Sequence, residues 1–146
     1  MSTDTNIALV QKLYAAFGQG DVATLLKNMS DDIDWGIEAS QSLEVPWHGI
    51  GTGKAFAASF FESLGKECEF SRFEPHGFLA SDTNVACLVD TEMTLRKSGR
   101  RVTQTGVHYF TIKNGLVTKW RGWEDTADTQ AAWVGKAHSQ RVAAAQ

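Results

Sequence analysis

Three polar residues, Gln104, His108 and Glu124, stand in apolar segments where their side chains could share one cavity. The first two are four residues apart in segment 101–113, and the third lies near the end of segment 116–125. Because side chains alternate between the two faces of a strand, Gln104 and His108 fall on one face. A buried glutamate without a partner has a raised pKa and can transfer a proton near neutral pH. An imidazole beside it could serve as an acid, a base or a hydrogen-bond donor.

A meander of strands has to position these residues. Four segments with strand-like patterning are separated by turns that contain Gly, Asn and Ser, which favour hairpins. Pro75 and Gly77 interrupt the first segment and indicate a β-bulge. The predicted strands span 68–80, 84–96, 101–113 and 116–125.

The first of the two hairpins around His108 indicates which face is buried. A two-residue turn at 98–99 pairs Val89 with His108 and Met93 with Gln104. One face of this strand pair is then nearly all apolar, so we expect it to point to the interior. His108 and Gln104 belong to that inner face.

The second hairpin, with its turn at 114–115, permits two registers. A two-residue loop would place Arg121 opposite His108, whereas a three-residue loop over 113–115 pairs His108 with Trp120. We prefer the three-residue loop because it directs the Trp120 ring inward and the Arg121 charge outward.

The preferred register also pairs Gln104 with Glu124 and Gly106 with Gly122 on the inner face. Two facing glycines weaken a strand. They mark either a place where a ligand approaches the backbone or a bend in a strongly curved sheet, and the spacing leaves both explanations open.

The first half of the chain predicts helices that could cover this sheet. Apolar residues recur at three- and four-residue steps in 5–17 and 53–64, and Asp21 is placed to cap a short helix between them. Helices followed by an antiparallel meander indicate an α+β fold. The remaining predicted elements are a strand at 33–38 that carries Trp35, a loop at 39–52, a last helix from near Asp128 and a frayed tail at 141–146.

Composition narrows the class of protein. The 146 residues carry a formal net charge of −3 without a basic stripe, which argues against binding to nucleic acid or to a membrane surface. We expect a single domain over 1–146, with a core over about 7–134, located in the cytoplasm. The histidines lack zinc-type spacing and no phosphate-binding loop is recognisable, so we expect no metal and no cofactor. Cys68 and Cys87 are expected to be free buried thiols.

Parts of the sequence resemble the SnoaL-like and ketosteroid-isomerase-like proteins of the NTF2-like superfamily. The similar segments are 13–26, 31–35, His48-Gly49 ahead of Phe60-Phe61, 108–115 and 120–126. The resemblance implies a cone, in which N-terminal helices pack on a strongly curved, mostly antiparallel sheet and enclose a pocket. It also implies a homodimer through the outer sheet face. Such relatives include ketosteroid isomerases, polyketide cyclases, limonene-type epoxide hydrolases and dehydratases, besides non-catalytic members.

The resemblance further implies roles for single residues. Tyr14 matches the helix position of the oxyanion-binding tyrosine of ketosteroid isomerases, and His108 matches the strand position of their second oxyanion donor. Glu124 matches the late acidic residue that looks like the base in SnoaL-type cyclases. Glu38 is the acidic residue nearest to the position of the ketosteroid isomerase base, from which it is displaced by one residue.

Each candidate also has a structural alternative. Tyr14 could be a core tyrosine, His108 a histidine bonded across the sheet, and Glu124 a salt-bridge partner at the pocket mouth. His48 could gate the pocket, but its position is more typical of an exposed surface loop. The predicted pocket wall consists of Trp35, Glu38, Phe56, Phe60, Met93, Gln104 and Trp120.

Two functions fit these residues. The first is an isomerase- or lyase-type enzyme, resembling ketosteroid isomerases or polyketide cyclases, that moves a proton on a small apolar carbonyl compound. In it Glu124 takes the proton, and His108 and Tyr14 stabilise the developing oxyanion. The second is a non-catalytic ligand-binding or dimeric assembly module. A crystal structure with an open pocket that holds unexplained density near His108 would favour the enzyme, whereas a pocket filled by Trp35 and Trp120 would favour the module.

Overall fold

Six strands form one sheet in the order β2-β1-β6-β5-β4-β3. The structure is a computed structural model that describes residues 2–39 and 44–135, so the predicted tail at 141–146 lies outside the described residues. The strands are β1 (Met29–Ile37), β2 (Gly49–Thr52), β3 (Cys68–Ala80), β4 (Asn84–Leu95), β5 (Arg101–Lys113) and β6 (Leu116–Trp123). The helices are α1 (Thr3–Gly18), α2 (Val22–Lys27), α3 (Lys54–Glu67) and α4 (Thr126–Trp133).

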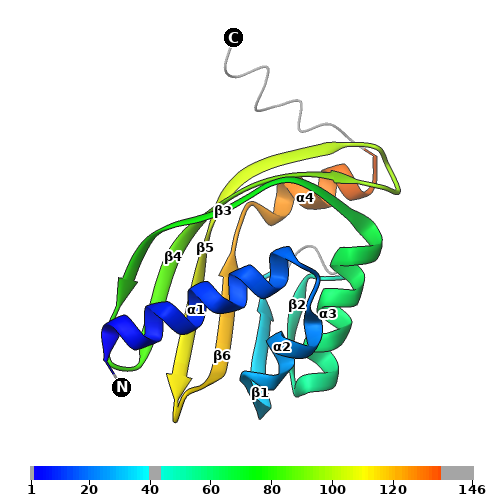
Figure 1. Cartoon of the computed structure of the whole chain (residues 1–146). Helices are drawn as coiled ribbons and strands as arrows, with labels where there is room; N and C mark the ends of the chain where they lie inside the picture. The colour runs from blue at the N-terminus through cyan, green and yellow to red at the C-terminus, as the bar shows by residue number, and fades with distance from the viewer. Residues whose placement is uncertain (1, 40–43, 136–146) are drawn as a thin grey trace.

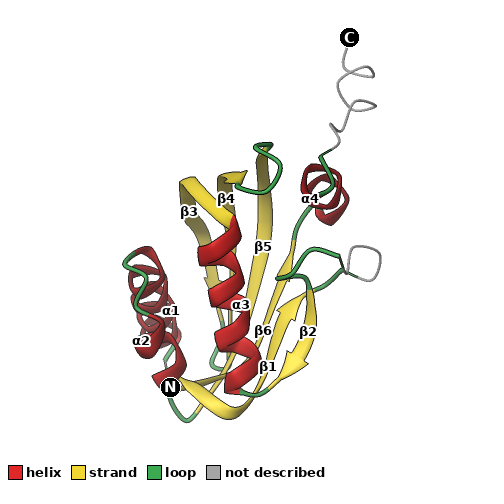
Figure 2. Ribbon diagram, turned by 90° about the vertical axis from the view of Figure 1, so that its right-hand side faces the viewer, coloured by secondary structure: helices red, strands yellow, loops and turns green. Residues whose placement is uncertain are grey.

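Helices α1, α2 and α3 lie on one side of a curved sheet (Figures 1 and 2). Neighbouring strands are antiparallel except β1 and β6, which run parallel. α3 packs beside β1, and α4 follows β6 and packs on β5. The predicted α+β architecture, with helices on the inner face of a strongly curved and mostly antiparallel sheet, is confirmed. The short strand β2 was missed because its glycines are typical of a loop.

Aspartate caps fix where two helices around the interior begin. Asp21 accepts a hydrogen bond from the Thr24 amide at the start of α2, at 3.1 Å, as the sequence predicted. Asp125 accepts one from the Asp128 amide at the start of α4, at 3.0 Å. Such a cap stabilises a helix by about 1 kcal/mol because the amides of the first turn have no partner within the helix. The second cap turns the chain from β6 into α4 directly after Glu124.

The hairpin between β4 and β5 has a longer turn than predicted. The Leu95 amide donates to the Arg100 carbonyl oxygen at 2.9 Å, which leaves four residues in the loop. His108 is therefore opposite Cys87, and the predicted pairing with Val89 is wrong by two residues. Because a shift by two residues keeps every side chain on its face, the predicted inner face of the hairpin is unaffected.

The hairpin between β5 and β6 has the two-residue loop that we did not prefer. The chain turns through residues 114–115, which have φ angles of 54° and 77°. A bulge at Thr118 then adds one residue to β6, so His108 lies opposite Gly122 instead of Trp120. The bulge restores the alternation that the shorter loop had reversed. Trp120 is thus directed inward as predicted, but for a different reason.

The two glycines that were predicted to face each other make room for groups of the protein itself. A Cβ on Gly122 would lie 2.9 Å from the Trp120 ring, and a Cβ on Gly106 would lie 2.8 Å from the Trp123 carbonyl oxygen. Gly122 therefore accommodates the Trp120 ring, and Gly106 lets the chain turn out of β6 toward Glu124. The close approach at these positions is to protein atoms.

Candidate functional site

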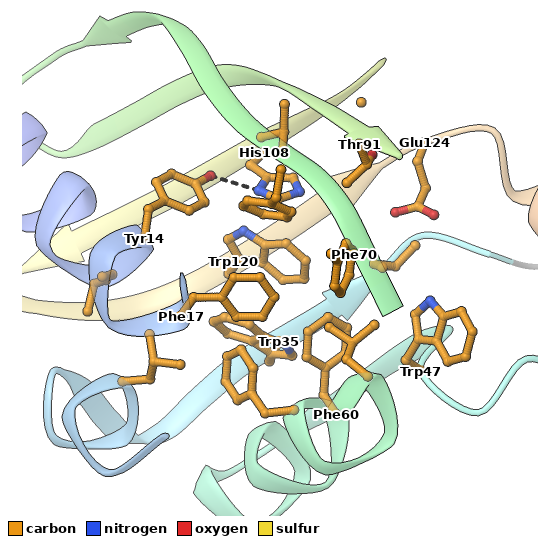
Figure 3. Close-up of a pocket in the computed structure, with 18 of the residues that line it drawn as sticks. Tyr14, Phe17, Trp35, Trp47, Phe60, Phe70, Thr91, His108, Trp120 and Glu124 are labelled. Carbon is orange, nitrogen blue, oxygen red and sulfur yellow. Dashed lines mark hydrogen bonds between the residues drawn. The ribbon is translucent and has the colours of Figure 1, made fainter. Parts of the chain in front are cut away.

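A cavity of about 90 Å³ lies between the concave face of the sheet and the helices (Figure 3). Its wall is mainly aromatic and aliphatic, and Trp35 and Trp120 stack in it with their ring centroids 4.4 Å apart. The two tryptophans do not fill the cavity, and His108 lines it together with them. The polar residues on the wall are Tyr14, Thr91, Gln104, His108 and Glu124.

His108, on β5, stands at one end of the polar part of the wall. Its Nδ1 lies 2.7 Å from the Tyr14 hydroxyl oxygen, and its ring meets Trp120 edge-on at 4.9 Å between centroids. Burial lowers the pKa of His108 to about 4, although the negative charge of Glu124 opposes this change. The imidazole is therefore neutral at pH 7, and the half-buried residue lines the cavity.

Tyr14 reaches His108 from α1. Its ring packs edge-on against Phe110 at 5.8 Å between centroids and contributes to the cavity wall. Burial raises the pKa of the phenol, so the hydroxyl stays protonated. The hydroxyl oxygen also lies 3.2 Å from Cys87 Sγ. The Tyr14 hydroxyl, which was predicted to bind the ligand beside His108, thus lies within hydrogen-bond distance of two protein groups and on the wall of the cavity.

Glu124 stands at the other end of the polar wall, where the chain leaves β6. Gln104 Nε2 donates to Glu124 Oε2 at 3.0 Å, and Gln104 Oε1 accepts a hydrogen bond from the Asp125 amide at 3.0 Å. Both ends of the Gln104 amide are thereby used to fix the carboxylate. The Glu124 side chain is 15% exposed and lines the cavity. Glu124 was expected to have a raised pKa if it lacked a partner, but its carboxylate has a partner in Gln104.

His48 is buried beside Glu124. Its Nε2 lies 3.7 Å from Glu124 Oε2, and none of its side chain is exposed. The prediction of an exposed loop histidine is wrong because the flanking residues Val45 and Trp47 are buried and draw the loop inward. Trp47 meets Trp133 of α4 edge-on at 5.7 Å between ring centroids. The signal available in the sequence was this pair of large apolar residues within a loop.

Most of the predicted wall residues do line the cavity, namely Trp35, Phe60, Met93, Gln104 and Trp120. Glu38 and Phe56 are not part of that wall, and these two predictions are wrong. Glu38 follows Ile37, which faces the cavity, so its side chain alternates to the other face and is exposed. Phe56 stands in the first turns of α3, where its ring packs against Gly51 of β2.

An aromatic partition made by Phe17, Phe70 and Phe73 was not predicted from the sequence. Phe17 lies 4.8 Å from Phe73 and 5.9 Å from Phe70 between ring centroids. The partition separates the cavity from a groove of about 510 Å³ between the C-terminal end of α1 and β3. Phe70 and Phe73 would lie on opposite faces of a regular strand. A bulge between Phe70 and Arg72 brings both to the inner face, and the sequence gives no sign of it.

The two cysteines, Cys68 and Cys87, are free and buried, as predicted. Burial raises the pKa of the Cys68 thiol to about 12. Within residues 2–39 and 44–135, no three His, Cys, Asp or Glu side chains are grouped as metal ligands would be. None of the helices in that same part of the chain has the length and apolar character needed to cross a membrane.

Comparison with known proteins identifies the family to which a protein with this fold and cavity belongs. Residues 10–120 match the profile of the SnoaL-like domain. None of the curated proteins matches the chain. An NTF2-like protein from Burkholderia xenovorans LB400 is 28% identical, with 87% of this chain and 94% of that chain covered and a TM-score of 0.77. An NTF2-like protein of unknown function from Burkholderia pseudomallei K96243 is 25% identical, with coverage of 88% and 95% and a TM-score of 0.77.

A third solved structure contains a ligand. TerC, co-crystallised with polyporic acid, is 24% identical, with 84% of this chain and 93% of that chain covered and a TM-score of 0.73. At this identity the likeness concerns the fold. The profile match covers most of the chain and agrees with the curved sheet and enclosed cavity described above. The chain belongs to the SnoaL-like domain family of the NTF2-like superfamily.

Proposed function

We propose that the protein is an isomerase- or cyclase-type enzyme that transfers a proton on a small, mainly apolar carbonyl compound. The observation that carries the proposal is that Glu124 and His108 line one apolar cavity at separate points of its wall (Figure 3). One group is a carboxylate held in place, and the other is a neutral imidazole. Such a pair can accept a proton and bind the resulting negative charge at different atoms of one substrate.

The proposed reaction begins at a carbon next to the substrate carbonyl. Glu124 accepts the proton from this carbon, and the electron pair of the broken C–H bond moves toward the carbonyl to give an enolate. His108 hydrogen-bonds the enolate oxygen as its charge develops. Where a C=C bond adjoins this carbon, the enolate is conjugated with it, and the protonated Glu124 returns the proton to the far carbon of that bond. The double bond thereby moves next to the carbonyl group, which completes an isomerisation without net consumption of any group. The chain supplies both the base and the oxygen-binding group, so the proposed reaction needs no cofactor.

The apolar surroundings support this assignment. Trp120 and Phe73 flank the His108 ring at 4.9 and 6.3 Å between centroids. A hydrogen bond to a developing charge is stronger where water is excluded, and loss of one oxyanion donor typically costs about 10²–10³ in kcat. A cavity of about 90 Å³ is smaller than the roughly 150 Å³ that hold benzene, so a larger substrate has to displace the aromatic partition. TerC with polyporic acid supports an organic ligand for this fold.

Thermal shift with a panel of small ketones tests the proposal. A ketone that raises the Tm of the wild type should raise it much less in His108→Ala, because a ligand stabilises only the form that binds it. His76→Ala is the control, since the His76 side chain is 42% exposed. If no ketone raises the wild-type Tm, or if His108→Ala responds like the wild type, the proposal is wrong.

A dimeric assembly is the second candidate function, and one observation favours it. Leu88, Val107 and Trp123 are 40%, 39% and 44% exposed on the outer face of the sheet. They form a continuous row, because Leu88 pairs with Val107 and Val107 pairs with Trp123. A row of large exposed apolar side chains is typical of an interface. We propose that a second copy of the chain covers it.

Sedimentation velocity tests the assembly. The wild type should sediment as a dimer, and Trp123→Asp should sediment as a monomer because a charge would be buried in the contact. Leu79→Asp is the matched control, since Leu79 is 74% exposed but lies outside the row. A monomeric wild type, or a dimer that survives Trp123→Asp, would contradict the proposed face.

A further inference from the structure

Side chains from α1, β4 and β5 meet in a chain of hydrogen bonds at the cavity wall. The Tyr14 hydroxyl oxygen lies 2.7 Å from His108 Nδ1 and 3.2 Å from Cys87 Sγ. A dashed line in Figure 3 marks the first of these contacts. Cys87 and His108 are directly opposite each other in the β4–β5 pair, so the strand register brings the sulfur and the ring to the same hydroxyl. Cys87 was predicted only as a free buried thiol, and the reaction proposed above does not use it.

The number of protons available limits how the chain of hydrogen bonds between Cys87, Tyr14 and His108 can be arranged. Burial raises the pKa of Tyr14 and of Cys87, so the phenol and the thiol each keep one proton. The low pKa of His108 leaves one proton on its ring. In one arrangement the thiol donates to the phenol, and the phenol donates to Nδ1. In the other, Nδ1 donates to the phenol oxygen, and the phenol donates to sulfur.

The strengths of the donors and acceptors favour the first arrangement. A phenol donates well, an unprotonated imidazole nitrogen accepts well, and 2.7 Å is a short distance for such a bond. Sulfur is a weak acceptor, so the second arrangement would direct the phenol proton to the poorer partner. With Nδ1 as the acceptor, the proton of the ring is on Nε2.

We propose that Tyr14 and Cys87 are positioning residues that hold His108 as the neutral tautomer with its proton on Nε2. In Figure 3 the second ring nitrogen lies on the side away from Tyr14 and faces Thr91 and Glu124. The site thus presents an N–H donor, and the ligand atom that meets it has to be an acceptor such as a carbonyl or enolate oxygen. An ammonium group, which only donates, finds no partner at this nitrogen.

The tautomer can be measured without a ligand. In protein labelled with ¹⁵N-histidine, two-bond proton–nitrogen correlations at pH 7 should show His108 with an unprotonated Nδ1 and a protonated Nε2. The signals of His108 are assigned by their loss in His108→Gln. A proton on Nδ1 in the wild type would overturn the proposal.

The role of Cys87 has its own readout in the infrared. The S–H stretching band moves to lower frequency when the thiol donates a hydrogen bond, and Cys68→Ala leaves Cys87 as the single thiol of the chain. In that background, Tyr14→Phe should move the band to higher frequency, whereas Tyr109→Phe should leave it unchanged. A Cys87 band that does not respond to Tyr14→Phe would show that the thiol packs beside the phenol without donating to it, and would overturn its role.

The inference deepens the proposed function and rests on it only for the identity of the ligand. Its failure can be recognised separately. Absence of any response to ketones together with the Nε2–H tautomer would contradict the proposed function and support the hydrogen-bond chain. A response to ketones together with the Nδ1–H tautomer would support the proposed function and contradict the proposed chain of hydrogen bonds.

Discussion

Acid should destabilise the folded protein partly through His108. Burial lowers the pKa of this ring from an ordinary 6.5 to about 4. Between these two values the unfolded chain binds a proton that the folded protein does not. The contribution to the free energy of unfolding therefore decreases as the pH falls from about 6.5 to about 4. Above this range both states carry the neutral ring, and the contribution no longer changes.

The magnitude follows from the two pKa values. They differ by about 2.5, which corresponds to roughly 3 kcal/mol at pH values below both. At about pH 4.5 most of this difference applies, so the wild type should lose about 2–3 kcal/mol through His108 alone. This is a large part of the 5–15 kcal/mol by which domains are typically stable.

Urea denaturation near pH 7 and near pH 4.5 measures this loss. His108→Gln is the reference, because glutamine is polar and does not titrate, and because both proteins carry the same carboxylates. The wild type should lose about 2–3 kcal/mol more than His108→Gln between the two pH values. Equal losses in the wild type and His108→Gln would refute the argument that burial keeps His108 neutral.

Three substitutions test the packing and the polar wall of the cavity. Gly122→Ala should lower stability by about 1–3 kcal/mol in thermal unfolding, because its methyl group would lie 2.9 Å from the Trp120 ring, and an unchanged Tm would contradict this contact. Gln104→Leu should cost about 1–3 kcal/mol in urea unfolding because the Glu124 carboxylate loses its donor, and equal stability would mean that the bond is dispensable. Phe17→Ala should open the aromatic partition and raise the affinity for a naphthalene-sized fluorescent probe by about tenfold. An unchanged affinity in a fluorescence titration would contradict the conclusion that Phe17 limits the size of the cavity.

Strand parity explains why much of the candidate site could be predicted although the strand pairs were wrong. Both hairpins differ from the predicted pairing by an even number of residues, so His108, Gln104 and Trp120 remain on the inner face. The apolar alternation determines a face, whereas the length of a turn determines the partner. A four-residue loop and a bulge at Thr118 change partners without changing faces.

Other parts of the site depend on contacts that alternation does not encode. Phe70 and Phe73 share a face because of a bulge that no proline or glycine marks. His48 is buried because the loop around it folds inward on Trp47. Cys87 meets Tyr14 only once the true β4–β5 register is known, since the predicted register placed Val89 opposite His108. Glu38 was taken from a family resemblance, and the alternation of β1 excludes it from the wall.

Exchange of the α-hydrogens of acetone, a ketone smaller than benzene, for deuterium tests most directly whether Glu124 and His108 act together in the cavity of about 90 Å³. In D₂O, proton NMR should show that the wild type accelerates this exchange, and that Glu124→Gln and His108→Ala each slow it by about 10²-fold or more. His76→Gln should retain the wild-type rate, since His76 is not one of the residues that line the cavity. A wild type that leaves the exchange at its rate in buffer, or variants that match the wild type, would contradict proton transfer in this cavity.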